Sequence, residues 1–110
     1  PLLGMRINLN TRKPLIANPP GGYSGPAVFP VAVRMVYQVA NAVKIPVIGM
    51  GGIATAEDAI EFMLAGATAV SVGAMNFVNP YATSEIVKGI ESYMRRYEIE
   101  DINELIGCVK

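Results

Sequence analysis

The chain of 110 residues is long enough for one small domain or for part of a larger one. Its nine basic and nine acidic residues give a formal net charge of zero, which argues against nucleic acid as a partner. The sequence contains no apolar run of about 18 residues and therefore predicts no membrane span, and its single cysteine, Cys108, indicates a reducing, cytoplasmic compartment.

The first part of the chain predicts a β-hairpin, a loop and a helix. Residues 5–9 alternate apolar and polar, "NTRK" supplies a polar turn, and "PLIA" forms the returning strand. Residues 18–26, "NPPGGYSGP", are rich in glycine and proline and predict a loop. In residues 27–43 the polar residues Arg34, Gln38 and Asn41 recur at helical spacing, which predicts a helix with one narrow wet face and the rest buried.

Two short buried strands follow, and each leads into a helix. "PVIGM" from Pro46 precedes a helix that begins at Thr55, with Asp58 at the capping-box position. "TAVSVG" from Thr68 precedes "AMNFVNP", which suits a short extra helix, and then a long helix over residues 83–97. A second capping box opens a final short helix at "INELIG". This alternation indicates parallel βα units.

Glycines stand where the two strands end. Gly51 and Gly52 close the first strand, and Gly73 and Ala74 close the second, about one βα unit later. In (β/α)8 barrels the loops after the last two strands often bind phosphate, and backbone N–H groups can do this without a cation. Each glycine alone favours a simple tight turn, but the paired arrangement favours a phosphate site. Flavin mononucleotide (FMN), sugar phosphates and nucleotides all bind in this way.

The stretch "LIANPPGGYSGPAVFPVAVRMVYQVANAVKIPVIGMGGI" resembles the dihydroorotate dehydrogenase family, in particular its NAD-linked, two-subunit bacterial type. The most specific part is "GGYSGPAVFPVAVRMVYQVA", and the resemblance extends over essentially the whole chain. It implies an α/β fold that forms the C-terminal portion of a (β/α)8 TIM barrel, with a β-hairpin insertion near the N-terminus. Residues 1–110 would then be one partial barrel with no second domain.

The resemblance also implies an activity and its cofactors. The family oxidises dihydroorotate to orotate through FMN in de novo pyrimidine (UMP) biosynthesis. A partner subunit with FAD and a 2Fe-2S cluster would relay electrons to NAD, and the catalytic subunits would form a homodimer. Carried over to this chain, Gly25, Gly51 with Gly52, and Gly73 with Ala74 would bind the FMN, and no metal would be held.

The chain departs from the family pattern at several positions. Ala74 replaces a usual threonine, Tyr23 replaces a leucine, and the prolines at 19 and 20 are unusual in their loop. The family's catalytic cysteine, with lysine and asparagines around the flavin, would precede Pro1. We therefore expect a segment that lacks the N-terminal half of the barrel, is inactive alone, and carries Cys108 only as a structural thiol.

Two other interpretations remain open at this point. One is a related flavin barrel, such as the pyrimidine-reducing domain of dihydropyrimidine dehydrogenase, and the other is an inactive truncated barrel. Among the other side chains, we expect the methionines Met35, Met50, Met63, Met75 and Met94 to fill the core. The acids Glu57, Asp58 and Glu61 should form a solvated helix surface.

Overall fold

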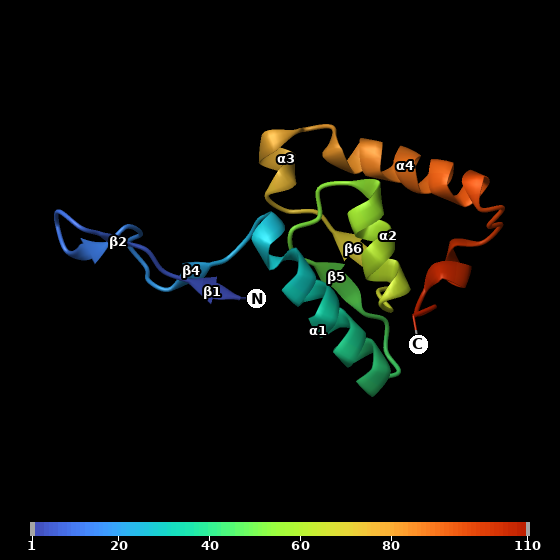
Figure 1. Ribbon diagram of the computed structural model, residues 1–110, viewed down its shortest axis with the longest axis horizontal. Coiled ribbons are helices and arrows are strands. Elements are labelled where there is room, and N and C mark those ends of the chain that lie inside the picture. Colours follow the sequence, from blue (N-terminus) through green and yellow to red (C-terminus); the bar gives the residue numbers. More distant parts are fainter. Residues whose placement is uncertain (1, 110) are drawn as a thin grey trace.

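The structure is a computed structural model that describes residues 2–109, and it consists of a mixed α/β body with a long arm (Figure 1). The arm comprises residues 2–24 and the body the remainder. The molecule extends 57 × 33 × 18 Å with a Cα radius of gyration of 16.4 Å. A compact domain of this size has a radius of gyration of about 13 Å, and the difference reflects the arm.

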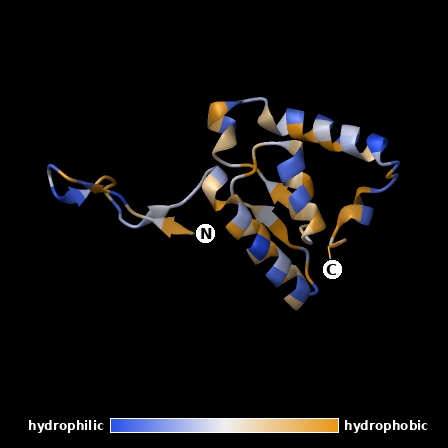
Figure 2. Ribbon diagram, viewed as in Figure 1, coloured by the Kyte–Doolittle hydropathy of each residue, from blue (hydrophilic) through white to orange (hydrophobic). Residues whose placement is uncertain are grey.

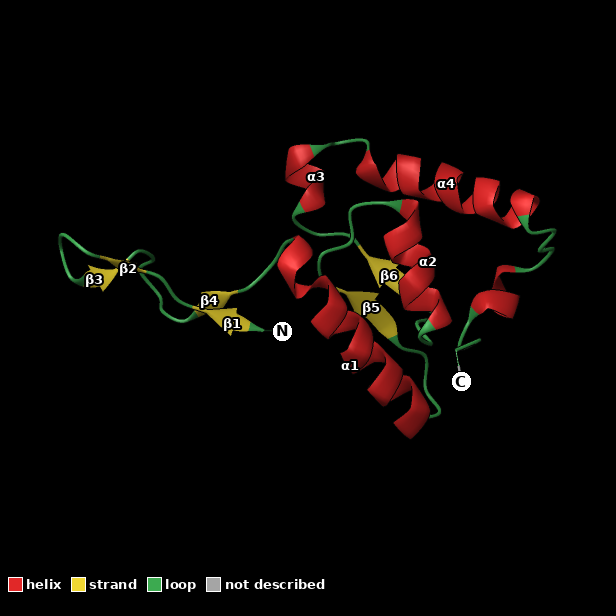
Figure 3. Ribbon diagram, viewed as in Figure 1, coloured by secondary structure: helices red, strands yellow, loops and turns green. Residues whose placement is uncertain are grey.

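Short strands build the arm, and helices surround two further strands in the body (Figure 3). The strands are β1 (Leu3–Gly4), β2 (Ile7–Asn8), β3 (Lys13–Pro14), β4 (Gly21–Gly22), β5 (Ile48–Met50) and β6 (Ala69–Ser71). The helices are η1 (Pro26–Val28), α1 (Phe29–Ala42), α2 (Ala56–Leu64), α3 (Met75–Val78), α4 (Ala82–Arg96) and η2 (Ile102–Leu105), of which η1 and η2 are 3-10 helices. Among residues 2–109, no helix has the length and apolarity needed to cross a membrane.

The arm is a ribbon with two short antiparallel pairings. Strand β2 pairs with β3, so that Ile7 lies opposite Pro14, and β1 pairs with β4 nearer the body. The second pairing includes Gly21 and Gly22, which the sequence analysis wrongly assigned to a loop. The many glycines and prolines of this stretch are typical of a loop, and β4 forms only because β1, which is distant in the sequence, pairs with it. That the hairpin is an insertion into a barrel stays a prediction.

The body is organised around the parallel pair β5 and β6. Ile48 lies opposite Ala69 and Met50 opposite Ser71, so both strands end at the same edge. This confirms the predicted parallel βα units, and the helices after each strand lie where the sequence placed them within a few residues. In Figure 2 these two strands carry mainly hydrophobic colours.

Helix α2 supplies most of the core. Thr55 caps it: its hydroxyl accepts from the Asp58 N–H, while the Asp58 carboxylate accepts from the Thr55 N–H, which completes the predicted capping box. Phe62 is fully buried and meets the Phe29 ring edge-on, with centroids 5.4 Å apart. Burial of a side chain of this size contributes about 1.5–3 kcal/mol, so this contact joins α1 to α2.

Two expectations about buried faces were wrong. Helix α1 has a second exposed side with Met35 and Val39, because no element among the described residues covers it. On β5, Ile48 and Met50 share one face and are 58% and 60% exposed, whereas the alternate residue Gly49 is buried against Phe62 of α2. Only one face of the two-stranded sheet is therefore covered.

Helices α2 and α4 approach closely at a glycine, and this generates a stability prediction. A Cβ at Gly89 would collide with the Ala56 methyl group. In the intact protein that carries these residues, Gly89→Ala should lower the free energy of unfolding by about 1–3 kcal/mol through overpacking, although alanine is the better helix former by about 1 kcal/mol. Urea unfolding measures this, with exposed Lys88→Ala as a control that stays within about 0.5 kcal/mol. An unchanged or more stable Gly89→Ala variant would contradict the close packing.

Candidate functional site

A hollow of about 570 Å³ opens where the loops after β5 and β6 meet the start of α1. This volume is typical of cofactor sites, which span roughly 300–1,000 Å³. Most of its wall is apolar side chain, and the rest is loop backbone and a few hydroxyl side chains. The lining residues are Leu2, Tyr23, Ser24, Gly25, Pro26, Val28, Ala32, Met35, Val36, Val39, Val47, Ile48, Met50, Gly51, Gly52, Ile53, Ala54, Ser71, Gly73, Ala74, Met75 and Val78.

All five residues predicted to bind a cofactor line this hollow, and they come from three loops. Gly25 precedes η1, Gly51 and Gly52 follow β5, and Gly73 and Ala74 follow β6. The parallel register of β5 and β6 brings the last two loops to the same edge of the sheet. That these residues bind a cofactor stays a prediction, but the structure brings them together.

The loop after β5 is fixed by close backbone packing. Gly52 has φ of +73°, and a Cβ there would lie 2.6 Å from the Gly25 carbonyl oxygen and 2.9 Å from the Phe29 Cβ. Gly51 has φ of +126°, and a Cβ there would lie 2.8 Å from the Ala32 Cβ. Any side chain would therefore push this loop away from α1, and the left-handed backbone would add strain.

The loop after β6 is different, because it has open space beside it. A Cβ at Gly73 would meet no atom within 4 Å, and its φ is not positive. The Gly73 carbonyl accepts from the Asn76 N–H at 3.0 Å, and the Ala74 carbonyl accepts from the Phe77 N–H at 3.1 Å. Outside the helices and the strand ladders, no backbone hydrogen bond between described residues uses the N–H groups of Gly51, Gly52, Gly73 or Ala74.

The N-terminus of α2 lies next to the Gly51–Gly52 loop but already has its own anion. The Asp58 carboxylate accepts from the N–H groups of Ala54 and Thr55, both at 2.9 Å. Asp58, which was expected at the capping-box position and on the same solvated helix surface as Glu57 and Glu61, caps this helix as predicted. The N–H groups of Ala54 and Thr55 are therefore not available to an external anion.

No acid, lysine, arginine, histidine or cysteine lines the hollow within residues 2–109, and its side-chain polar groups are the hydroxyls of Tyr23, Ser24 and Ser71. Sequence reasoning missed the apolar wall. Met35 and Met50 were expected in the core, but both line the hollow and are 40% and 60% exposed. Only Met63 among the five methionines is buried. The signal that could have revealed the apolar wall was the clustering of Met35 and Met50 on one side of α1 and β5.

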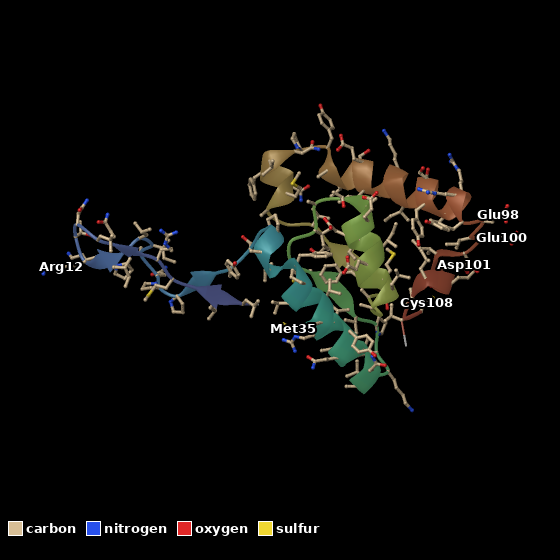
Figure 4. The ribbon with its side chains drawn as sticks, in the orientation of Figure 1. Arg12, Met35, Glu98, Glu100, Asp101 and Cys108 are labelled. Atoms are coloured by element: carbon tan, nitrogen blue, oxygen red, sulfur yellow. The ribbon has the colours of Figure 1, made fainter. Side chains whose placement is uncertain are left out.

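The remaining candidates lie away from the hollow. Figure 4 shows Cys108 near the C-terminus, where its thiol donates to the Glu104 carbonyl and is exposed. The same view shows Glu98, Glu100 and Asp101 at the turn beyond α4. In the described part of the chain, no group of three histidine, cysteine or acidic residues could hold a metal ion.

Comparison with known proteins supports the family resemblance. Residues 2–94 match the dihydroorotate dehydrogenase family. The proteins named dihydroorotate dehydrogenase B (NAD(+)), catalytic subunit, of Lachnoclostridium phytofermentans and Alkaliphilus oremlandii are 67% and 68% identical to the chain, over 99% and 96% of its length. The protein of the same name from Porphyromonas gingivalis is 59% identical over 97% of the chain. The chain spans only 35–36% of the length of these relatives.

The two glycine loops should respond differently to the same substitution. Gly52→Ala should lower the free energy of unfolding by about 1–3 kcal/mol, because its methyl group would lie against the Gly25 carbonyl. Gly73→Ala should stay within about 0.5 kcal/mol, since it has open space and an ordinary backbone conformation. Urea unfolding of both variants in the intact protein, without ligand, measures the difference. Equal effects would mean that the loop after β5 is not packed as described.

Proposed function

The chain belongs to the dihydroorotate dehydrogenase family, and we propose that it holds the phosphate end of FMN in an NAD-linked enzyme of this family. The enzyme oxidises dihydroorotate to orotate in pyrimidine biosynthesis. Within it, residues 1–110 are the last βα units of a (β/α)8 barrel, whose other part supplies the remaining strands.

The observation that carries this proposal is the meeting of two glycine loops at one hollow, with N–H groups that no loop or turn hydrogen bond between described residues uses. The groups of Gly51 and Gly52 come from one side and those of Gly73 and Ala74 from the other. These four residues are exposed or half-buried, so water can satisfy their N–H groups when no ligand is bound. A phosphate that accepts from these groups needs no cation.

The residues present also suit the rest of FMN. The wall beside the glycine loops is apolar and includes Met35, Val39, Ile48 and Met50. Such a surface accepts the flat aromatic ring of a flavin, and methionine packs well on aromatic rings. The glycine backbones give the phosphate close access, since no side chain stands at Gly51, Gly52 or Gly73. The hollow thus offers a polar backbone end and an apolar side-chain end.

The residues that line the hollow would bind and orient FMN, but they would not transfer the substrate proton. Oxidation of dihydroorotate removes one hydride and one proton, and bound FMN supplies the hydride acceptor. The hydroxyls of Tyr23, Ser24 and Ser71 are the polar side-chain groups of the hollow, and within residues 2–109 no ion pair or side-chain hydrogen bond joins them to a charged group that would make them a base. The proton-abstracting cysteine of the family therefore belongs to the preceding part of the barrel.

The other components of the enzyme follow from the family and the names of the relatives. The relatives are catalytic subunits of NAD-linked enzymes, and we assign to this chain the same place beside an electron-transfer subunit. That partner carries FAD and a 2Fe-2S cluster and passes electrons to NAD, and two catalytic subunits form a homodimer. The free Cys108 agrees with a cytoplasmic enzyme.

A charge introduced at Gly73 tests the phosphate site. Because Gly73 has open space, Gly73→Asp and Gly73→Asn should both fold, and they differ mainly by one negative charge. Two like charges about 4 Å apart repel by about 1 kcal/mol in water and about 4 kcal/mol near a protein surface. Gly73→Asp should therefore reduce the preference for FMN over riboflavin, which lacks the phosphate, by at least about fivefold.

Flavin fluorescence titration of the intact protein gives both affinities. Gly73→Asn is the matched control and should keep the preference within about twofold, which corresponds to less than about 0.5 kcal/mol. If Gly73→Asp prefers FMN over riboflavin by the same ratio of affinities as the native protein, no phosphate binds at this loop.

The absence of a base in the hollow generates a second prediction. A polypeptide limited to residues 1–110, supplied with FMN and dihydroorotate, should form orotate no faster than free FMN does, because no lining residue accepts the substrate proton. Orotate absorbance measures the rate, and free FMN is the control. Turnover above that control would show that the segment contains the base itself.

A further inference from the structure

Asn76 lies on α3 behind the loop after β6 and has no part in the wall of the hollow. It nevertheless holds both peptide groups that flank Gly73. Its side-chain amide donates to the Val72 carbonyl at 2.8 Å, and its backbone N–H donates to the Gly73 carbonyl at 3.0 Å. The side-chain hydrogen bond is partly buried, so solvent competes with it only weakly.

Because peptide groups are planar, these two hydrogen bonds also fix the directions of the Gly73 and Ala74 N–H groups. In a trans peptide the C=O and the N–H point in opposite directions, and the one cis bond among residues 2–109 is Pro19–Pro20. The Val72 carbonyl shares its peptide with the Gly73 N–H, and the Gly73 carbonyl shares its peptide with the Ala74 N–H. With both carbonyls bound to Asn76, both N–H groups point away from Asn76. Gly73 and Ala74 line the hollow, whereas Val72 and Asn76 do not.

This loop needs such a restraint because packing does not supply one. No atom lies within 4 Å of a Cβ built on Gly73, and glycine samples more backbone conformations than any other residue. The loop after β5 is held differently, since Gly52 abuts the Gly25 carbonyl and Phe29. One loop is thus fixed by backbone packing and the other by a hydrogen-bonded side chain.

We propose that Asn76 is a positioning residue for phosphate binding: its side-chain amide fixes the Val72–Gly73 peptide so that the Gly73 N–H faces the hollow. This rests on the proposed function, because it presumes that the hollow takes the phosphate of FMN. Without the amide, the Val72–Gly73 peptide is free to rotate, and its N–H is no longer directed at the phosphate. Asn76 itself touches neither FMN nor substrate.

The test compares two flavins on the intact protein. Asn76→Leu keeps the branching at Cγ but is larger and removes the donor, and Asn76→Ala removes the donor with less bulk in case the Asn76→Leu variant does not fold. Either variant should weaken FMN binding by about tenfold, as expected when a hydrogen bond to a charged group is lost. Riboflavin affinity should stay within about twofold, because riboflavin has no phosphate. The ratio of the two affinities isolates the phosphate, since partial unfolding lowers both equally.

Asn79→Ala is the matched control. Asn79 follows the same short helix, and its side chain bonds Glu85 and the Tyr81 N–H instead of the loop after β6. Its variant should keep the native ratio. Native-like ratios in both Asn76 variants would overturn the role of Asn76 while leaving the phosphate site intact. A native protein that binds FMN no better than riboflavin would overturn the proposed function and this inference together.

Discussion

The parallel register of β5 and β6 determines where the candidate site lies. Because Met50 pairs with Ser71, the two strands end together, and the residues that follow them emerge side by side. An antiparallel pairing would send Gly51 and Gly73 to opposite edges. The close contact of Gly52 with the Gly25 carbonyl then adds a third loop to the same edge. One register thus assembles a site from three separate parts of the chain.

The backbone in this region has a clear division of roles. Carbonyls after β6 are bonded internally, to Asn76 and Phe77, while the N–H groups of the same peptides are left for the hollow. After β5, Asp58 uses the N–H groups of Ala54 and Thr55, and no loop hydrogen bond between described residues uses that of Gly52. Spare donors that face an apolar hollow favour an anionic ligand, because an anion satisfies several of them at once.

The sequence predicted the elements of the body well and their exposed faces poorly. The capping box at Thr55 and the parallel strands followed from local patterns, the family followed from a resemblance over the whole chain, and all three are confirmed. The uncovered side of α1 at Met35 and the pairing of Gly21 did not follow, because they depend on which distant segments lie alongside. The hydrophobicity of a residue shows that burial would be favourable, but only the fold shows whether another element buries it.

The meeting of the glycine loops at one hollow was predictable from the sequence, and the contact of Asn76 with the loop after β6 was not. Glycines at strand ends are visible in the sequence because they require the absence of a side chain. A side chain that orients those glycines from behind resembles any polar residue of a short helix. Asn76 and Asn79 look alike in "MNFVNP", yet only Asn76 bonds the Val72 carbonyl.

A site made of backbone N–H groups tolerates some changes and is sensitive to others. Ala74, where the family usually has threonine, loses a hydroxyl but keeps its N–H, so the main donor of that residue is preserved. A side chain at Gly52 would displace the loop itself, because the Gly25 carbonyl lies 2.6 Å from the position of its Cβ. The sensitive positions are therefore those that hold the peptide planes in place, whether or not they face the ligand. In such a site, specificity for phosphate depends more on the orientation of the backbone than on the side chains that surround it.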